Sequence, residues 1–300
     1  QSRGLGDVYK RQGDGGSRTF LSIATAGTGG IYYPLGGGLA RELTVADSTR
    51  TYTAEVTGGS VENVNRLLTG EVDLAFALAS TPYLAREEAR EGSDQIRFIA
   101  PLYANMTHIV VPGSSSATSV ADFRGQRVSV GAAGSGTEQV AQQVLAAYGL
   151  SYDDIEPRYL SFSESAAALK DGAIDGAIIS VGYPAAAILE ATTTAGARLL
   201  PVDAEQMTTL TSDFAYYSAG TIPAGVYPGL DGDVPTIAVM NWVISMADLD
   251  AEVVQAVLEV MTTGKQQLAR VHEMANQIDM DLLDTSPFPL HDAVEAWRLR

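Results

Sequence analysis

The sequence contains no cysteine among its 300 residues. This absence excludes disulfide bonds, thiolate metal sites and a cysteine nucleophile, and it is compatible with an oxidising compartment. Long apolar runs are missing as well, because no stretch approaches the 18 residues that a membrane-spanning helix needs. We therefore expect no direct membrane insertion. A chain of this length can instead bury a substantial core in two domains.

Basic residues are few, with 19 Lys and Arg against 36 Asp and Glu, which gives a formal net charge of −17. This balance argues against nucleic acid and anionic membrane surfaces as partners. It does not exclude a small anionic ligand, because charges farther away than about 8–10 Å are largely screened at physiological salt.

Motifs for catalysis, metals and nucleotides are also missing. The three histidines, His108, His272 and His291, are scattered and form no HExxH pattern. No GxSxG nucleophile motif occurs, and the glycine-rich segments match neither the P-loop nor GxGxxG. The sequence therefore predicts no catalytic residue, no metal and no cofactor.

Two glycine loops are the features around which the chain is organised. In the first, an apolar segment from Phe20 leads into residues 26–30 and then into leucines at helical spacing. The second, residues 134–137, likewise lies between an apolar strand and a helix pattern. A strand–glycine loop–helix junction directs backbone N–H groups and the positive end of a helix dipole at one place, where an anion can bind. One such loop is most simply a tight turn, but two copies in matching positions favour a shared ligand.

The matching loops indicate two similar α/β halves, and two long apolar segments are predicted to join them. Residues 96–111 and 234–246 both read as extended strands that pass from one half to the other. Lobe 1 is predicted to be discontinuous and to comprise residues 19–106 and 239–300. Lobe 2 is predicted to be continuous, over residues 107–238. Residues 1–18 are predicted to be a non-native or disordered leader without a signal-peptide core. The ligand is expected in the cleft between the lobes.

Local patterns predict further details of the elements. Ser60 is placed to cap the helix that follows it, and Ser163 or Ser165 is placed to cap an alanine-rich helix. Thr137 is expected to cap the helix after the second glycine loop, where Ser135 offers its hydroxyl to the ligand. Residues 216–233 read as a long irregular segment. Tyr32 and Tyr33 would point about 100° apart in a helix, so one faces the cleft, and Tyr33 is the predicted contact.

Six segments together resemble the TAXI family, the TRAP-associated extracytoplasmic immunogenic proteins, over Phe20 to about His291. The resemblance implies a type II periplasmic-binding-protein fold of two α/β lobes with a two-strand hinge and no catalysis. It also implies a periplasmic or extracytoplasmic location and delivery of a small carboxylate or amino acid to the membrane permease subunits of a sodium-driven TRAP transporter. The segments are residues 24–40, 57–75, 122–141, 169–184, 222–227 and 289–291.

The predicted ligand contacts combine the loops with hydroxyl and aromatic side chains nearby. The ligand-binding residues are Gly27, Thr28, Gly29, Gly30, Tyr33, Ser60, Tyr103, Ser135, Gly136, Thr137 and Tyr183. Leu78 stands where the family tends to have a polar side chain, and no arginine lies beside either loop. A monocarboxylate or a zwitterion is therefore expected to bind more tightly than a dicarboxylate.

Two alternatives stay open beside a monomeric binding protein. One is an enzyme on a similar two-lobed fold, against which the missing cysteine and paired bases argue. The other is the ligand-sensing domain of a regulator.

Overall fold

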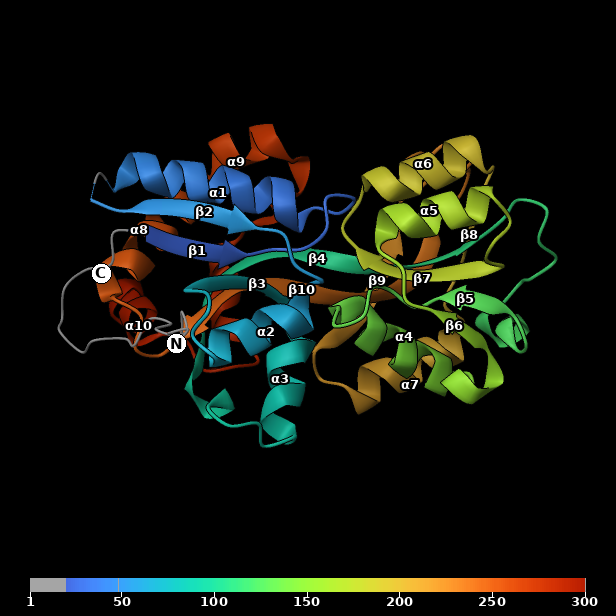
Figure 1. Ribbon diagram of the computed structural model, residues 1–300, viewed down its shortest axis with the longest axis horizontal. Coiled ribbons are helices and arrows are strands. Elements are labelled where there is room, and N and C mark those ends of the chain that lie inside the picture. Colours follow the sequence, from blue (N-terminus) through green and yellow to red (C-terminus); the bar gives the residue numbers. More distant parts are fainter. Residues whose placement is uncertain (1–19, 48, 300) are drawn as a thin grey trace, which may run out of the picture.

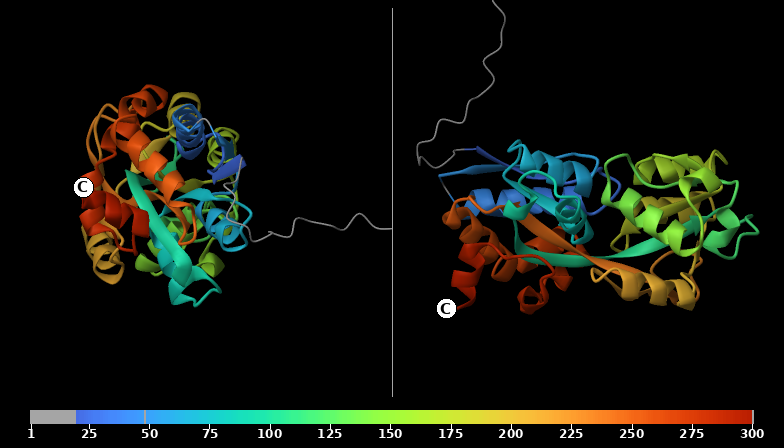
Figure 2. Two further views of the ribbon diagram at one scale, coloured as in Figure 1. Left: turned by 90° about the vertical axis from the view of Figure 1, so that its left-hand side faces the viewer. Right: turned by 90° about the horizontal axis from the view of Figure 1, so that it is seen from below.

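Two long strands run through both halves of the structure. The computed structural model describes residues 20–47 and 49–299, and the prediction of a leader over residues 1–18 lies outside them. Strands β4 (Ile96–Val111) and β10 (Val234–Met246) have the bounds expected from the sequence and pair with each other antiparallel. Figure 1 shows them passing between the two lobes, and Figure 2 shows the same crossing from below.

The first lobe holds the earliest and the latest described residues. Its own strands are β1 (Phe20–Ala24), β2 (Thr51–Glu55) and β3 (Leu74–Leu78). Its helices are α1 (Tyr32–Ala46), α2 (Ser60–Leu68), α3 (Ser80–Glu87), α8 (Ala251–Thr262), α9 (Lys265–Val271) and α10 (Asp292–Arg298), with 3-10 turns η1 (Ser93–Gln95), η4 (Glu273–Gln277) and η5 (Met280–Thr285). Strand β1 pairs in parallel with β2 and β3, and β3 pairs antiparallel with β10.

The second lobe repeats this design at the other end of the long strands. Its strands are β5 (Arg127–Ser129), β6 (Glu156–Arg158), β7 (Gly176–Val181), β8 (Arg198–Leu200) and β9 (Tyr217–Ile222). Its helices are α4 (Gly136–Ala147), α5 (Phe162–Lys170), α6 (Ala186–Thr194) and α7 (Ala204–Asp213), with 3-10 turns η2 (Val120–Phe123) and η3 (Tyr152–Asp154). Strand β5 pairs in parallel with β6 and β7, and β7 pairs antiparallel with β4.

All the strands belong to one sheet that extends through both lobes, in the order β2-β1-β3-β10-β4-β7-β5-β6, with β8 on β4 and β9 on β10. The partner of β10 changes from β9 at Val239 to β3 at Asn241. The pairing of β4 with β7 begins at Met106. We propose that the lobes divide near these residues, at 106/107 and 238/239.

Apolar periodicity accounts for the packing of helices onto this sheet. Leu35, Leu39 and Leu43 lie one turn apart on α1 and are fully buried, as their spacing predicts. Strand β7 is buried along its whole length because helices cover both faces of the sheet there (Figure 1). Such strands read as continuous apolar runs, which is why they are visible in the sequence.

Three local predictions are wrong. Ser60 is the first residue of α2 rather than its cap, and its Oγ accepts the N–H of Leu78 (3.1 Å). Ser161, not Ser163 or Ser165, caps α5, because its Oγ accepts the N–H of Glu164 in a reciprocal capping box. Residues 216–233 are not wholly irregular, since β9 forms there by pairing with the edge of β10.

Candidate functional site

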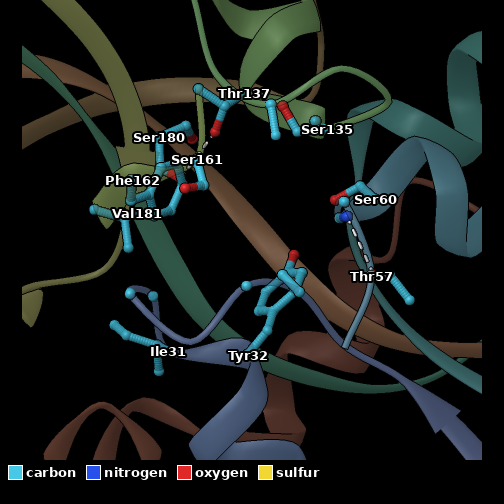
Figure 3. A pocket seen from close by; sticks show the side chains of 18 of the residues that line it. Ile31, Tyr32, Thr57, Ser60, Ser135, Thr137, Ser161, Phe162, Ser180 and Val181 are labelled. Atoms are coloured by element: carbon cyan, nitrogen blue, oxygen red, sulfur yellow. Dashed lines mark hydrogen bonds between the residues drawn. The ribbon is translucent and has the colours of Figure 1, made fainter. Parts of the chain in front are cut away.

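A cavity of about 280 Å³ lies between the lobes. Its wall is built from the loops and helix starts of the first lobe, those of the second lobe, and residues of strands β3, β4 and β7. Figure 3 shows Ile31 and Tyr32 on one side, Ser135 and Thr137 opposite, and Ser180 and Val181 between them. The site is therefore complete only when both lobes contribute.

Four helices begin at this cavity. The first residues of α1, α2, α4 and α5 all line it: Tyr32, Ser60, Gly136 and Phe162. The first N–H groups of a helix have no partner within that helix, and the helix dipole places partial positive charge there. The cavity thus faces four positive helix ends, of which the two glycine loops account for only two.

Two buried phenols also face the cavity. Burial raises the pKa of Tyr32 far above its ordinary value, and a hydrogen bond with Ser60 opposes this only in part. Burial likewise raises the pKa of Tyr103, and the nearby Tyr32 adds to the effect. Both rings are therefore neutral at physiological pH. The Tyr32 hydroxyl donates to Oδ1 of Asn241 and points toward the interior of the cavity (Figure 3).

The hydroxyl groups of the lining differ in how far they are satisfied. Oγ of Ser135 accepts the N–H of Glu138 (3.1 Å) and so caps α4. Oγ1 of Thr137 lies 3.4 Å from the carbonyl oxygen of Ser180. Oγ of Ser180 itself has no hydrogen-bond partner among the described residues, although Ser180 is only 2 % exposed. A buried hydroxyl without a partner is costly, so a group in the cavity that bonds to it is stabilised.

None of the described residues in the lining is charged. Two glutamates lie close by, but the carboxylate of each accepts a backbone hydrogen bond and neither lines the cavity. Glu62 accepts the N–H of Gly58 (2.7 Å) and Glu138 accepts that of Gly134 (3.2 Å). Arg158 lies on β6 and pairs with Glu156 (2.9 Å). The cavity consequently offers dipoles and neutral donors rather than a cation.

The lobes touch each other on both sides of the cavity. On one side, the N–H of Glu62 donates to the carbonyl of Gly134 (3.0 Å) and Oγ1 of Thr81 donates to Gln139 (2.8 Å). On the other side, Gly29 lies so close to Ser163 that a Cβ at Gly29 would stand 3.2 Å from the Ser163 nitrogen. The structure therefore represents a closed arrangement of the lobes.

Most of the residues predicted as ligand contacts meet at this cavity, and their role in binding stays a prediction. The ones that line it are Gly27, Thr28, Gly29, Gly30, Ser60, Tyr103, Ser135, Gly136 and Thr137. Tyr33 and Tyr183 do not. Tyr33 is 37 % exposed on α1, while its neighbour Tyr32 is 7 % exposed and faces the cavity. The prediction that Tyr33 is the tyrosine facing the cleft is therefore wrong. Tyr183 is half-buried and packs against the hydrophobic core.

Sequence reasoning missed part of the lining. Ser180 and Asn105 lie within apolar strands, and only the register of β4 against β7 brings them together. Ser161 and Phe162 come from the start of α5. The Ser-x-x-Glu spacing of Ser161 and Glu164 is a capping-box signature that marks this helix start, so it could have been found.

Other kinds of site find no support in the described ranges. Residues 20–47 and 49–299 contain no group of three His, Cys, Asp or Glu side chains placed to hold a metal ion. No helix in the same ranges has both the length and the apolar character to cross a membrane.

A family model and several solved structures match this chain. The model of the NMT1-like family matches residues 23–297. The alkanesulfonate-binding protein from Xanthomonas axonopodis pv. citri bound to MOPS is 20% identical, with a TM-score of 0.52, covering 88% of this chain and 86% of that chain. PhnD1 from Prochlorococcus marinus (MIT 9301) in complex with methylphosphonate is 12% identical, with a TM-score of 0.58, covering 87% of this chain and 91% of that chain.

A third similar structure is described as a candidate L-cystine ABC transporter from Listeria monocytogenes. It is 15% identical, with a TM-score of 0.53, covering 88% of this chain and 99% of that chain. At such low identity these likenesses concern the fold. They confirm the prediction of a two-lobed α/β fold of the periplasmic-binding-protein kind.

Proposed function

This chain belongs to the NMT1-like family, whose model spans nearly all of it, and on that basis we propose that it is an extracytoplasmic solute-binding protein. It captures a small ligand between its lobes and delivers it to a membrane transporter. The observation that carries this proposal is a cavity that both lobes close and that four helix starts face, with Ser180, whose hydroxyl has no partner among the described residues, in its lining.

Binding without chemistry is the activity that the lining supports. The described lining residues include no Asp, Glu, His, Lys or Cys that could act as a general base or nucleophile. The raised pKa values of Tyr32 and Tyr103 keep both phenols protonated, so neither supplies a phenolate. An enzyme remains the alternative, and turnover of any bound compound would favour it.

The ligand we propose is a small molecule with one carboxylate, such as a keto acid, a hydroxy acid or a neutral amino acid. Each helix start adds about 0.3–2 kcal/mol for an anion, and each charge-assisted hydrogen bond adds about 1.5–3 kcal/mol. A micromolar Kd requires about 8 kcal/mol, which a few such contacts supply without an arginine. A second carboxylate would need a compensating cation, whereas the described lining has no charged residue and includes Leu78, Val181 and Phe162.

We propose a TRAP-type permease as the partner, on the strength of the six segments that resemble the TAXI family. An ABC transporter is the second candidate, because one similar structure carries that description. Proteoliposomes that contain the TRAP permease subunits would separate the two. Uptake that needs this protein and a sodium gradient supports the TRAP partner, whereas uptake that needs ATP and an ABC transporter contradicts it.

Calorimetry with a small panel tests the ligand class. The purified protein is titrated with pyruvate, 2-oxobutyrate, glutamine, glutamate, 2-oxoglutarate and methylphosphonate. We expect one of the first three compounds to bind most tightly. Tighter binding of glutamate, 2-oxoglutarate or methylphosphonate would show that the site takes a dicarboxylate or a tetrahedral anion, and the proposed ligand class would be wrong.

A further inference from the structure

A chain of buried polar side chains crosses the floor of the cavity from the first lobe to the second. Tyr32 on α1 donates to Oδ1 of Asn241 on β10. Nδ2 of Asn241 donates to Oδ1 of Asn105 on β4 (2.8 Å), and Nδ2 of Asn105 donates to the carbonyl of Ser180 on β7 (2.9 Å). The two asparagines thus link the lobes, and they lie on the two strands that connect the lobes.

Two backbone carbonyls fix which way each asparagine amide points. A carbonyl can only accept, so the Asn241 nitrogen must face the carbonyl of Tyr103 (2.8 Å) and the Asn105 nitrogen must face that of Ser180. The oxygen of Asn105 is then turned toward the nitrogen of Asn241. The hydrogen-bond network therefore determines the orientation of both amides.

Asn241 occupies an irregularity in the sheet. The β10–β4 register shifts between Met240 and Trp242, so that Asn241 lies opposite both Leu102 and Tyr103 of β4. An extra residue of this kind disrupts the ladder and leaves backbone groups without their regular partners. At this irregularity the Asn241 side chain donates a hydrogen bond to the Tyr103 carbonyl, which takes the place of a missing strand-to-strand hydrogen bond. The same side chain also donates to Asn105 and fixes its orientation.

Asn105 is the member of this pair that reaches the ligand space. It lines the cavity and is 5 % exposed, whereas Asn241 is fully buried behind it. Both N–H groups of Asn241 are occupied, but Nδ2 of Asn105 has one partner among the described residues, the Ser180 carbonyl. Its second N–H therefore remains for an acceptor in the cavity, which Ser180 also lines.

We infer that Asn105 is a specificity-determining residue that donates an N–H to an acceptor oxygen of the ligand, and that Asn241 is the positioning residue that fixes this orientation. The inference rests on the proposed function and names one contact of that site. Because Asn105 is bonded to both lobes, a ligand oxygen on this amide also reinforces the closed arrangement. The contact selects ligands that place a carboxylate or carbonyl oxygen at the floor of the cavity.

Affinity changes in a set of variants test the contact. In calorimetry with the panel above, Asn105→Asp replaces the donor by an anionic acceptor of the same shape, and we expect at least a hundredfold loss of affinity for carboxylates. Asn276→Asp is the matched control, since it adds the same charge on an exposed turn, η4, and should bind like the parent. Parent-like affinity of Asn105→Asp would overturn the inference.

The role of Asn241 is tested by non-additivity. Asn241→Ala should weaken binding about tenfold although Asn241 is not in the cavity lining, and it should add nothing once Asn105 is alanine. A merely structural role would instead weaken binding equally in both backgrounds.

A measurement without ligand separates this inference from the proposed function. The same two alanine variants and their double variant form a cycle in chemical unfolding, where we expect a clear coupling between the asparagines. Independent, additive losses of stability would refute the positioning role even if every panel compound bound. Conversely, a parent that binds no panel compound but shows the coupling refutes the proposed ligand class and leaves the asparagine pair standing.

Discussion

Single polar atoms, rather than charges, distinguish the wall of this cavity. Ser180 is buried with no partner for its hydroxyl among the described residues, while Ser60, Ser135 and Asn105 each use part of their bonding capacity within the protein. Buried polar groups with unmet hydrogen bonds lower the stability of the ligand-free protein. A ligand acceptor that completes these hydrogen bonds is therefore bound more tightly. Recognition by this set of groups depends on where the ligand oxygens lie.

The first prediction concerns the hydroxyl of Ser180. Ser180→Ala should weaken binding of the tightest panel compound about tenfold, the loss of one hydrogen bond to a charged group, and should leave the free energy of unfolding unchanged or slightly higher. Ser129→Ala is the matched control in the same lobe, because Ser129 is equally buried but pairs with Ser165 (2.7 Å) outside the cavity. The control should lose stability and keep its affinity. The reverse pattern would remove Ser180 from the site.

A second prediction at this scale concerns His108 and acid. Burial lowers the pKa of His108 from 6.5 to about 4, and its hydrogen bond to the Met106 carbonyl opposes this only in part. Since the unfolded chain takes up the proton first, the stability contributed by neutral His108 is complete above pH 6.5 and is lost as the pH falls toward 4. Between these two pH values, the slope of the free energy of unfolding against pH approaches about 1.4 kcal/mol per pH unit.

Chemical unfolding at pH 7 and pH 5 measures this slope in the parent and in His108→Gln. The variant should be less stable at pH 7, since Tyr227 loses its partner at Nε2 (3.0 Å), but it should lose less stability between pH 7 and pH 5. The burial of His272 and His291 lowers their pKa values too, and these contributions remain in both proteins. An equal loss in parent and variant would mean that His108 is not the group responsible.

Helix starts are the elements that shape the site, and one of them corrects an expectation about capping. From the sequence, Thr137 would cap α4 and Ser135 would serve only the ligand. The structure assigns the cap to Ser135, whose Oγ bonds to the N–H of Glu138. Thr137 lies inside the helix, and its hydroxyl is 3.4 Å from the Ser180 carbonyl.

Ser135→Ala should therefore lower the free energy of unfolding by about 1 kcal/mol, the usual cost of a lost cap. Thr137→Ala should have a clearly smaller effect, because it breaks only a long hydrogen bond. Chemical denaturation of the two variants ranks them directly. A larger loss in Thr137→Ala than in Ser135→Ala would restore Thr137 as the cap.

The sequence predicts these elements better than it predicts the site. The spacing of apolar residues and the glycine loops give the two halves, the bounds of β4 and β10, and most of the loop residues at the cavity. Ser180 and Asn105 could not be found in this way, because a lone polar residue in an apolar strand reads as core until the sheet register is known. The choice between Tyr32 and Tyr33 depends on where α1 begins, and helix ends are uncertain by a residue or two from sequence.

At the scale of the whole molecule, the proposed function requires the two lobes to close over the ligand. Backbone segments approach across the cleft where glycine leaves room. A Cβ at Gly29 would overlap the side chain of Ser163 in the opposite lobe. This contact exists only while the lobes are closed, so an added methyl group penalises the closed state alone.

Gly29→Ala should therefore weaken binding of the tightest panel compound by tenfold or more, with little change in the free energy of unfolding. Gly37→Ala on α1 is the control, because its Cβ would meet nothing within 4 Å and it should gain about 0.5–1 kcal/mol of helix stability. Its affinity should equal that of the parent. Equal affinities in all three proteins would show that the Gly29–Ser163 contact plays no part in binding.

Small-angle X-ray scattering of the parent protein, without ligand and at saturation with the tightest panel compound, tests the central claim most directly. Hinged capture predicts that the ligand-free protein samples a more open arrangement and that its radius of gyration falls when the ligand is bound. Gly29→Ala should stay at the larger radius at the ligand concentration that saturates the parent. An identical scattering profile of the parent with and without saturating ligand would contradict capture between the lobes.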